Sequence, residues 1–240
     1  MDDILARLSD ISADPYSSVA KTRERTGKKA IAVFPMHIPE EVVHAAGMLP
    51  VVLWRGNEPV TLGHSHVATF NCGLVRSFVD DAVRGKLAFL DGVVLWRQCL
   101  QAQGLRYIIE RSARPPFGYL EYLYLPALFP NMESFPGAAV KDFLLEEFGR
   151  LKTGMEKLAG CKVTTESLRH SIAIYNRDRD LIRQAYELRR QRPGMLSARE
   201  AMAIVQSSML MPKEEHAELL EKLLPELKRR KAAANGKVRV

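Results

Sequence analysis

The stretch KAIAVFP at residues 29–35 is followed by PEEVVHAAG at residues 39–47 and by LPVVLW at residues 49–54. The first and third are short apolar runs without a helical period, which is typical of buried strands, and Pro35 would end the first. The second begins with proline and two glutamates and ends with glycine, the usual limits of a helix. These residues therefore predict a β-α-β unit with a right-handed crossover.

Strand and helix patterns continue to alternate after this unit. The run LDGVVLW at residues 90–96 is apolar and β-branched, and residues 107–110 and 119–126 are two further strand candidates. Residues 72–85 have the pattern of a helix that Gly85 would end. Alternation of this kind predicts an α/β fold, with a Rossmann-like, mostly parallel sheet and flanking helices, followed by a helical segment.

The helical segment is indicated by four long amphipathic patterns, at residues 140–159, 165–190, 197–209 and 213–231. Ser197 and Glu200 have the spacing of a capping box at the start of the third. We expect an α/β domain at residues 1–135 and the helical segment at residues 136–231. Residues 232–240 read as a linker and the start of a second α/β domain that this sequence does not contain.

Composition narrows the class of protein. The 240 residues are 47% hydrophobic and 26% charged, which excludes disorder, and no apolar run is long enough to span a bilayer. The N-terminus is acidic and lacks the layout of a signal peptide, so we expect a cytoplasmic protein without a membrane partner.

The net charge of +7 invites comparison with nucleic-acid-binding proteins. Much of the excess lies at residues 189–192 and 228–231, near the predicted C-terminal ends of helices, where cations complement the helix dipole. No recognition motif with interleaved aromatic residues accompanies it, so we expect no nucleic-acid partner. A basic surface fits an anionic substrate, such as a coenzyme A thioester, equally well.

Two of the three cysteines lie in segments that suggest a site. Cys72 in FNCGLVRS and Cys99 in LWRQCL each follow a probable strand, and strand ends are where α/β folds build sites. Two thiolates would form part of the ligand set of an iron–sulfur cluster. A reactive thiol and a small buried side chain are the alternatives. The cysteine number and spacing fit neither a disulfide framework nor a zinc ribbon.

Several boxes together resemble a known family. PEEVVHAAGMLP at residues 39–50, the Cys-x-x-x-Arg-Ser box at residues 72–77 and GKLAFLDGV at residues 85–93 resemble the 2-hydroxyacyl-CoA dehydratase and benzoyl-CoA reductase subunits. SSMLMPKEEH at residues 207–216 and the tyrosine-rich run at residues 119–126 look closer to the B-type benzoyl-CoA reductase subunit. The resemblance spans nearly the whole chain.

The resemblance implies a cofactor and its ligands. Family subunits hold a 4Fe-4S cluster through three cysteines, and the first two fall on Cys72 and Cys99, with Arg76 and Ser77 near the cluster or the thioester. The third belongs to the second α/β domain, so we expect no third protein ligand from this chain. Cys161 matches no ligand box. Leu100 also departs from the family pattern, because many relatives have aspartate after the second cysteine.

The resemblance also implies a function. It points to the iron–sulfur subunit of an ATP-dependent, low-potential acyl-CoA reductase that dearomatises benzoyl-CoA-type thioesters by electron transfer coupled to protonation. The alternatives are a 2-hydroxyacyl-CoA dehydratase subunit and a truncated subunit kept only for assembly. The implied partners are an acyl-CoA substrate, a homologous second catalytic subunit and an ATP-hydrolysing iron–sulfur activator, since this chain has no P-loop.

Protonation of the substrate would require an acid close to it. His37, just beyond the first predicted strand, is the best-placed candidate by topology, and Glu41 is a lesser one. Each has a local alternative: a loop hydrogen bond for His37, and the helix N-terminus for Glu41. For Arg76 the alternative is a helix surface. His64 and His66 have alternate spacing that suits a metal, but no third ligand is close in sequence.

Overall fold

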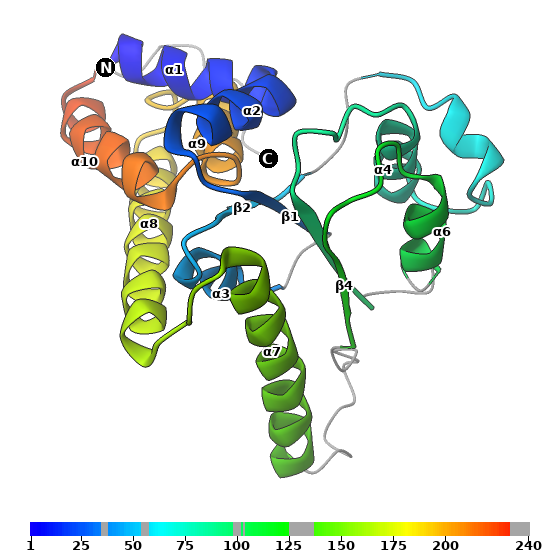
Figure 1. Ribbon diagram of the computed structural model, residues 1–240. Helices are drawn as coiled ribbons and strands as arrows, with labels where there is room; N and C mark the ends of the chain where they lie inside the picture. The colour runs from blue at the N-terminus through cyan, green and yellow to red at the C-terminus, as the bar shows by residue number, and fades with distance from the viewer. Residues whose placement is uncertain (35–37, 54–57, 98–101, 103, 125–136, 231–240) are drawn as a thin grey trace. The chain divides into compact units, whose positions relative to one another are not determined.

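The computed structural model describes residues 1–34, 38–53, 58–97, 102, 104–124 and 137–230. The chain divides into two compact units. One, here called the sheet unit, comprises Arg23–Leu168. The other, the helical unit, comprises Met1–Thr22 and Arg169–Val240. Figure 1 shows their elements in chain order from blue to red.

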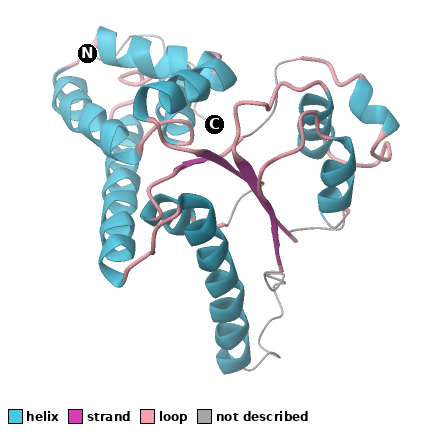
Figure 2. Ribbon diagram, viewed as in Figure 1, coloured by secondary structure: helices cyan, strands magenta, loops and turns pink. Residues whose placement is uncertain are grey.

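The sheet unit is built on parallel strands, which are β1 (Ala30–Phe34), β2 (Leu49–Val51), β3 (Gly92–Trp96) and β4 (Leu120–Leu123). Their order in the sheet is β2-β1-β3-β4, and every pairing is parallel (Figure 2). The register pairs Ala30 with Leu49, Ile31 with Gly92, and Val93 with Leu120. Strands β1, β2 and β3 are buried along their length, as expected of a sheet covered on both faces. The predicted α/β fold with a parallel sheet is confirmed.

Helices connect the strands and cover the sheet. They are α3 (Glu40–Ala45), α4 (Gly73–Val83), α6 (Leu105–Ser112) and α7 (Gly137–Ala159), with the 3-10 helix η1 (Leu62–Ser65) before α4. Helix α4 packs on α6, whereas α3 packs on α7. Right-handed crossovers in this strand order place α3 on one face and α4 and α6 on the other. The sheet is therefore the middle layer of three.

Two sequence expectations about local structure are wrong. Residues 107–110 lie in helix α6 and not in a strand. A short apolar run does not distinguish the two, and here Leu105 and Ile109 are buried on one helical face. Cys72 does not follow a strand directly, because β2 ends at Val51 and η1 intervenes. It is the N-cap residue of α4.

The amino edge of the sheet is held by a half-buried ion pair. Asp91, just before β3, accepts hydrogen bonds from Arg23 at 2.8 and 2.7 Å and from the amide of Ala30 at 2.9 Å. Burial raises the pKa of Asp91, but the Arg23 and Ala30 hydrogen bonds outweigh it, and the net pKa lies below the usual range. These contacts connect the end of helix α2 (Pro15–Thr26) to the starts of β1 and β3.

The helical unit contains α1 (Asp2–Ala13), most of α2 and α8 (Thr165–Gln191), together with α9 (Ala198–Ser208) and α10 (Lys213–Arg229). Its aliphatic core joins Leu8 of α1 to Ile204 of α9 and Leu220 of α10. The predicted capping box is confirmed: the amide of Glu200 donates to Ser197 Oγ at 3.2 Å, and the amide of Ser197 donates to Glu200 Oε2 at 2.7 Å.

The two units differ from the division expected at residues 135 and 136. Helix α1 belongs with the C-terminal helices, because Leu5 and Leu8 join their core. Helix α7 belongs with the sheet, where Leu151 and Met155 are fully buried. Residues 232–240, the expected linker and start of a further domain, lie outside the described residues. None of the described helices has the length and apolar character that a membrane span needs.

Candidate functional site

The strand order creates a place for a site at the carboxyl edge of the sheet. From β1 the chain passes to β2 on one side, and it then returns to β3 on the other side of β1. In open α/β sheets, ligands bind outside the carboxyl ends of the strands where the direction of winding changes. Here that point lies between β1, which ends at Phe34, and β3, which ends at Trp96.

Cys72 lies at this edge. The Phe78 ring of α4 stacks on Phe34, the last residue of β1, with ring centres 4.6 Å apart. Toward its other end, α4 approaches the amino edge, because the carbonyl of Ala82 accepts from the amide of Arg114, which precedes β4. The first turns of α4 therefore extend past the end of β1, by about 9 Å from Phe78 to Cys72 at 1.5 Å per residue. The Cys72 side chain is exposed and makes no capping hydrogen bond.

A buried aspartate fixes the chain that leads to Cys72. Asp80 of α4 accepts hydrogen bonds from the amides of Gly63 at 2.7 Å and Thr61 at 2.9 Å, and it pairs with Arg84 at 2.7 Å. Burial raises the pKa of Asp80, but the amide hydrogen bonds and the Arg84 charge outweigh it, so the net pKa is below the usual range. Asp80 thus ties the η1 segment to α4 as an ionised acceptor.

Close backbone packing adds to this attachment. A Cβ at Gly63 would meet the carbonyl oxygen of Arg76 at 2.8 Å and the amide of Asp80 at 3.0 Å, which is too close for any side chain. Sequence reasoning missed both Gly63 and Asp80 as positioning residues. The signal available was the pair Asp80-Asp81 between the apolar residues Val79 and Ala82, since buried carboxylates require partners.

Arg76 and Ser77 follow Cys72 on α4, as the sequence places them. Arg76 is half-buried, and no described residue accepts a hydrogen bond from its buried Nε. It lies one helical turn after Cys72, so both residues share a side of the helix. Ser77 is only 3% exposed and faces inward. Of these two side chains, Arg76 is the one placed to interact with a negative charge near the Cys72 thiol.

Of the other predicted site residues, Glu41 lies in a described segment, and His37 and Cys99 do not. His37 and Cys99 lie outside the described residues, in segments that follow β1 and β3 in the sequence. Glu41 is half-buried in the first turn of α3, the helix that follows β1. The N-terminus of α3 lies at the carboxyl edge because α3 connects parallel neighbours β1 and β2. Glu41 therefore belongs to the same edge as Cys72.

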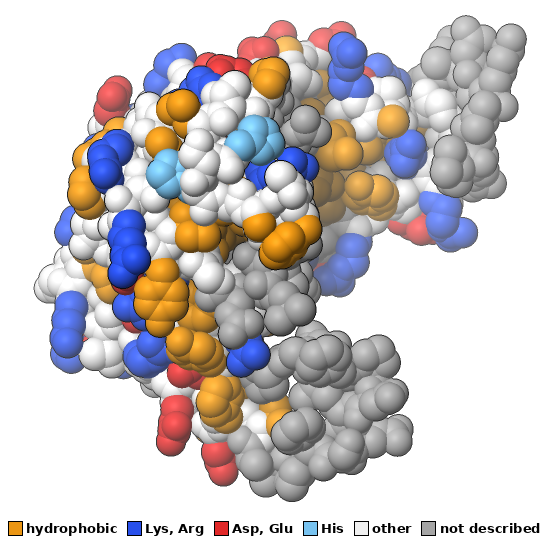
Figure 3. Space-filling model, turned by 90° about the vertical axis from the view of Figure 1, so that its right-hand side faces the viewer, with side chains coloured by type: hydrophobic (Ala, Val, Ile, Leu, Met, Phe, Trp, Pro, Cys, Tyr) orange, Lys and Arg blue, Asp and Glu red, His pale blue; other side chains and the backbone are white. Residues whose placement is uncertain are grey.

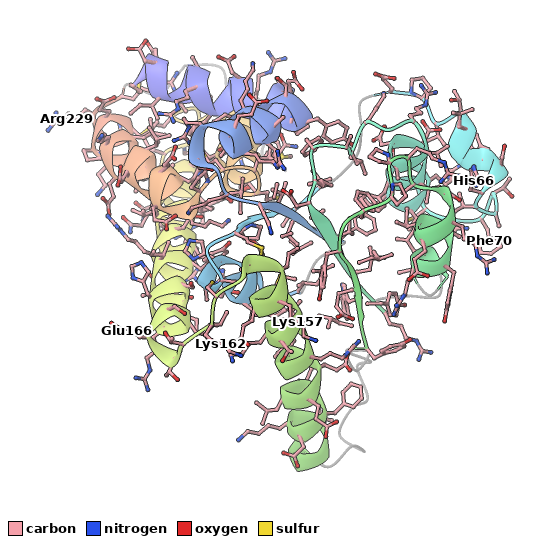
Figure 4. The ribbon with its side chains drawn as sticks, viewed as in Figure 1. His66, Phe70, Lys157, Lys162, Glu166 and Arg229 are labelled. Carbon is pink, nitrogen blue, oxygen red and sulfur yellow. The ribbon has the colours of Figure 1, made fainter. Side chains whose placement is uncertain are left out.

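Cys161 lies at the opposite edge. Its Sγ is 3.6 Å from the carbonyl oxygen of Ala46, at the end of α3 that leads into β2. The turn is held by Glu156, whose pKa is lowered to about 2 by hydrogen bonds from Lys152, the amide of Val163 and Lys162. Figure 4 shows Lys157 and Lys162 near this end of α7. Cys161 is thus separated from Cys72 by the length of the strands.

The segment before Cys72 is exposed. Phe70 is 75% exposed, and Figure 4 shows it with His66 at the outer side of the sheet unit. His66 Nδ1 lies 3.0 Å from Ser112 Oγ, which ties this segment to α6. On the face that Figure 3 presents, histidine and basic side chains are interspersed with apolar ones. His64 and His66 form no metal-binding group with other described side chains.

The fold and this edge define a doubly wound α/β protein with a free thiol at the winding switch. Comparison with known proteins then assigns the family: residues 35–240 match the model of the family described as 2-hydroxyglutaryl-CoA dehydratase, D-component. The chain belongs to that family, as its sequence boxes indicate.

Three relatives are informative. The chain is 28% identical over 223 residues to the (R)-phenyllactyl-CoA dehydratase beta subunit of Clostridium sporogenes, and the match covers 91% of this chain and 56% of that protein. It is 26% identical over 226 residues to a benzoyl-CoA reductase subunit of Thauera aromatica, covering 92% and 56%. It is 28% identical over 228 residues to the (R)-2-hydroxyglutaryl-CoA dehydratase beta subunit of Acidaminococcus fermentans, covering 93% and 57%. The chain thus spans little more than half the length of these relatives.

Proposed function

We propose that this chain is an iron–sulfur subunit of an acyl-CoA dehydratase or reductase, with Cys72 as one thiolate ligand. The observation that carries the proposal is the position of Cys72, an exposed thiol at the N-terminus of α4 beyond the winding switch of the sheet. The named activities of the relatives support the class of substrate, an acyl-CoA thioester.

In this proposal Cys72 contributes one ligand to a 4Fe-4S cluster. Cys72 offers a soft thiolate ligand at a helix N-terminus, where the backbone dipole favours negative charge. Cys99, in the segment after β3, would be the second ligand. Cys161 does not belong to the set because it lies at the amino edge. A bound cluster would supply an electron at low potential.

The protein groups around Cys72 would perform the other tasks. The Arg76 guanidinium would stabilise negative charge that develops on the thioester, because a fixed cation beside a partly dry site acts more strongly than one in water. Glu41 and His37 are the candidate proton donors at the same edge. Asp80 and Gly63 would keep the Cys72 segment in place.

The choice of substrate has two candidates. The sequence boxes favour an aromatic thioester, with the reductase reaction expected of the benzoyl-CoA type. The family description and two of the three relatives favour dehydration of a 2-hydroxyacyl-CoA. Anaerobic assays with both thioesters, in the presence of a second subunit and an ATP-hydrolysing activator, separate them by which thioester is consumed.

The test of the proposal is iron and acid-labile sulfide content with EPR, on protein purified anaerobically with its genomic neighbours. Wild type is compared with Cys72→Ala, Cys99→Ala and the matched control Cys161→Ala. We expect the cluster signal to be lost in the first two variants and kept in the third. Iron-free wild-type protein that is folded and bound to its partners would sink the proposal and favour an assembly subunit.

A further inference from the structure

The outer edge of strand β4 carries hydrogen bonds that the proposed function does not use. Strand β4 lies at one end of the described sheet, with β3 as its neighbour. An edge strand presents a row of backbone N–H and C=O groups, and a strand of another molecule can pair with such a row. The bonds that these groups already make within the chain therefore decide whether the edge is available.

The register of β3 and β4 determines which backbone groups of β4 face outward. The carbonyl oxygens of Tyr119 and Leu123 accept hydrogen bonds from the β3 side. In a parallel pair, the backbone groups of successive residues point alternately toward the partner strand and away from it. The N–H and C=O groups of Tyr122 therefore face the outer side of the sheet, as does the N–H group of Tyr124.

Side chains of the same chain bind these three outward groups. The amide of Tyr122 donates to Glu121 Oε1 at 3.0 Å, and the carbonyl oxygen of Tyr122 accepts from Arg150 at 2.9 Å. The amide of Tyr124 donates to Glu147 Oε2 at 2.6 Å. Each of these bonds occupies a backbone group that an added strand would need.

Ion pairs join the three side chains into one cluster, here called the edge clamp (Glu121, Glu147 and Arg150). Arg150 bonds to Glu121 Oε1 at 2.7 Å and to Glu147 Oε2 at 2.6 Å. The two carboxylate side chains are only 15% and 13% exposed, so each needs a partner, and Arg150 serves both. Charged side chains at a strand edge also oppose pairing, because an added strand would remove water from them.

Helix α7 brings the clamp to the edge. Gly154 of α7 lies against Tyr119, which precedes β4. Glu147 lies two turns earlier in the helix and bonds to Tyr124, which follows β4. Helix α7 therefore runs beside β4 in the opposite direction (Figure 1). A Cβ at Gly154 would overlap the Tyr119 hydroxyl, so this close approach requires glycine.

We propose that the edge clamp keeps β4 from pairing with β4 of a second copy of this chain. With the clamp in place, the outward groups of Tyr122 and Tyr124 are occupied. Without it, those groups lie at the spacing of a strand ladder. The same strand of a second copy then offers the complementary groups in an antiparallel, two-fold arrangement, and the chain associates with itself through its sheet.

The test is sedimentation of the full chain over a range of concentrations. Wild type is compared with the double variant Glu147→Ala/Arg150→Ala, which frees the Tyr122 carbonyl oxygen and the Tyr124 amide and leaves the net charge unchanged. We expect the self-association constant of the double variant to exceed that of wild type by at least about tenfold, because each copy gains hydrogen bonds across the new contact. An association constant equal to that of wild type overturns the proposal.

Two control variants separate strand pairing from other causes of association. Arg177→Ala/Glu221→Ala removes an ion pair of the same residue types in the helical unit, also without a change in net charge. Asp91→Ala removes the ion pair at the amino edge and destabilises the sheet unit without freeing the β4 edge. Both should associate no more than wild type. Association of Asp91→Ala as strong as that of the double variant overturns the proposal.

Amide hydrogen exchange locates the contact. In the double variant, the Tyr124 amide should exchange faster than in wild type at low concentration and become protected as the concentration rises. Association that leaves this amide unprotected overturns the proposal. If the double variant does not fold, Glu147→Ala is measured by the same criteria, since it leaves the bond between Arg150 and the carbonyl oxygen of Tyr122 in place.

Discussion

Two aspartates of the sheet unit are held in similar ways, whereas its two described cysteines lie in different surroundings. At the amino edge, Asp91 is satisfied by Arg23 and by the amide of Ala30. Midway along α4, Asp80 is satisfied by the amides of Gly63 and Thr61 and by Arg84. The cysteines differ: Cys161 lies against the end of α3 at the amino edge, whereas Cys72 begins a helix with no capping bond.

The two cysteines therefore differ in the role expected of their surroundings, which is structural at Cys161 and part of the candidate site at Cys72. The polar groups of the amino edge join strands and helices to one another. Asp80 is also structural, but it secures the segment that leads to an exposed thiol and a half-buried arginine at the carboxyl edge. Loss of Asp80 should therefore affect both folding and the candidate site, whereas loss of Asp91 should affect folding alone.

The largest effect is expected for Asp80→Ala. It removes the acceptor of two amide hydrogen bonds and the partner of Arg84, which should lower the free energy of unfolding by roughly 3 kcal/mol, since hydrogen bonds to buried charged groups are strong. Urea unfolding at pH 7 measures this, and under the proposed function the iron content should fall with it. Asp80→Asn, which keeps an acceptor oxygen, should lose less. An Asp80→Ala variant within about 0.5 kcal/mol of wild type would contradict the role given to this contact.

Asp91→Ala should have the next largest effect. Loss of its bonds to Arg23 and Ala30 should cost about 2 kcal/mol of stability, while iron content stays at the wild-type value. Because the pKa of Asp91 is depressed in the folded state, its contribution is present above its unfolded value near pH 4 and is lost as the pH falls through the folded value. The difference in stability between wild type and Asp91→Asn should therefore shrink in acid. A constant difference down to about pH 2 would refute this assignment.

Gly63→Ala tests the close backbone contact between η1 and α4. The new Cβ would clash with the backbone of Arg76 and Asp80, so we expect a loss of about 1.5 kcal/mol in the free energy of unfolding. Gly73→Ala, at the start of α4, is the matched control because its Cβ would meet no other atoms within 4 Å. Thermal unfolding should show the control unchanged or slightly stabilised. Similar losses in both variants would mean that close packing at Gly63 is not the cause.

The smallest effect is expected for Ser197→Ala in the helical unit. Loss of the N-cap hydrogen bond to Glu200 should lower stability by about 1 kcal/mol, measured by urea unfolding. Iron content should be unaffected, since Ser197 belongs to neither edge of the sheet. Ser197→Asp, which retains an acceptor, should restore most of the loss. A fall in iron content in Ser197→Ala would contradict the prediction that this cap affects stability alone.

The strands were predictable where the pattern was unambiguous. The apolar runs at residues 29–35 and 90–96 contain β1 and β3, and the capping box at Ser197 is present as expected. The run at residues 107–110 misled because three apolar residues in a row suit a strand and a buried helix equally. On α4 the buried face is formed by Val75, Phe78, Val79 and Ala82, and includes buried acids that an apolar pattern does not anticipate.

The candidate site was predictable in part. The sequence singled out Cys72 and Arg76 by their box, and the structure places both on the first turns of α4. It did not indicate Gly63 or Asp80, because their importance comes from a contact across 17 residues of chain. The assignments of His37, Cys99 and the cluster itself stay predictions.

The sequence by itself determined the alternation of strands and helices, the parallel class of sheet and the membership in a family of acyl-CoA-processing subunits. Each of these depends on local pattern or on ordered boxes, which are properties of the chain. The tertiary structure alone decided that Cys72 and Cys161 lie at opposite edges, that Asp80 secures the segment before Cys72, and that the His216 ring lies between Asp178 of α8 and the carbonyl oxygen of Ile204 in α9. Those facts depend on which residues, distant in the sequence, come into contact in the fold. A buried polar group without a hydrogen-bond partner costs free energy, so the fold determines which of these groups must be paired.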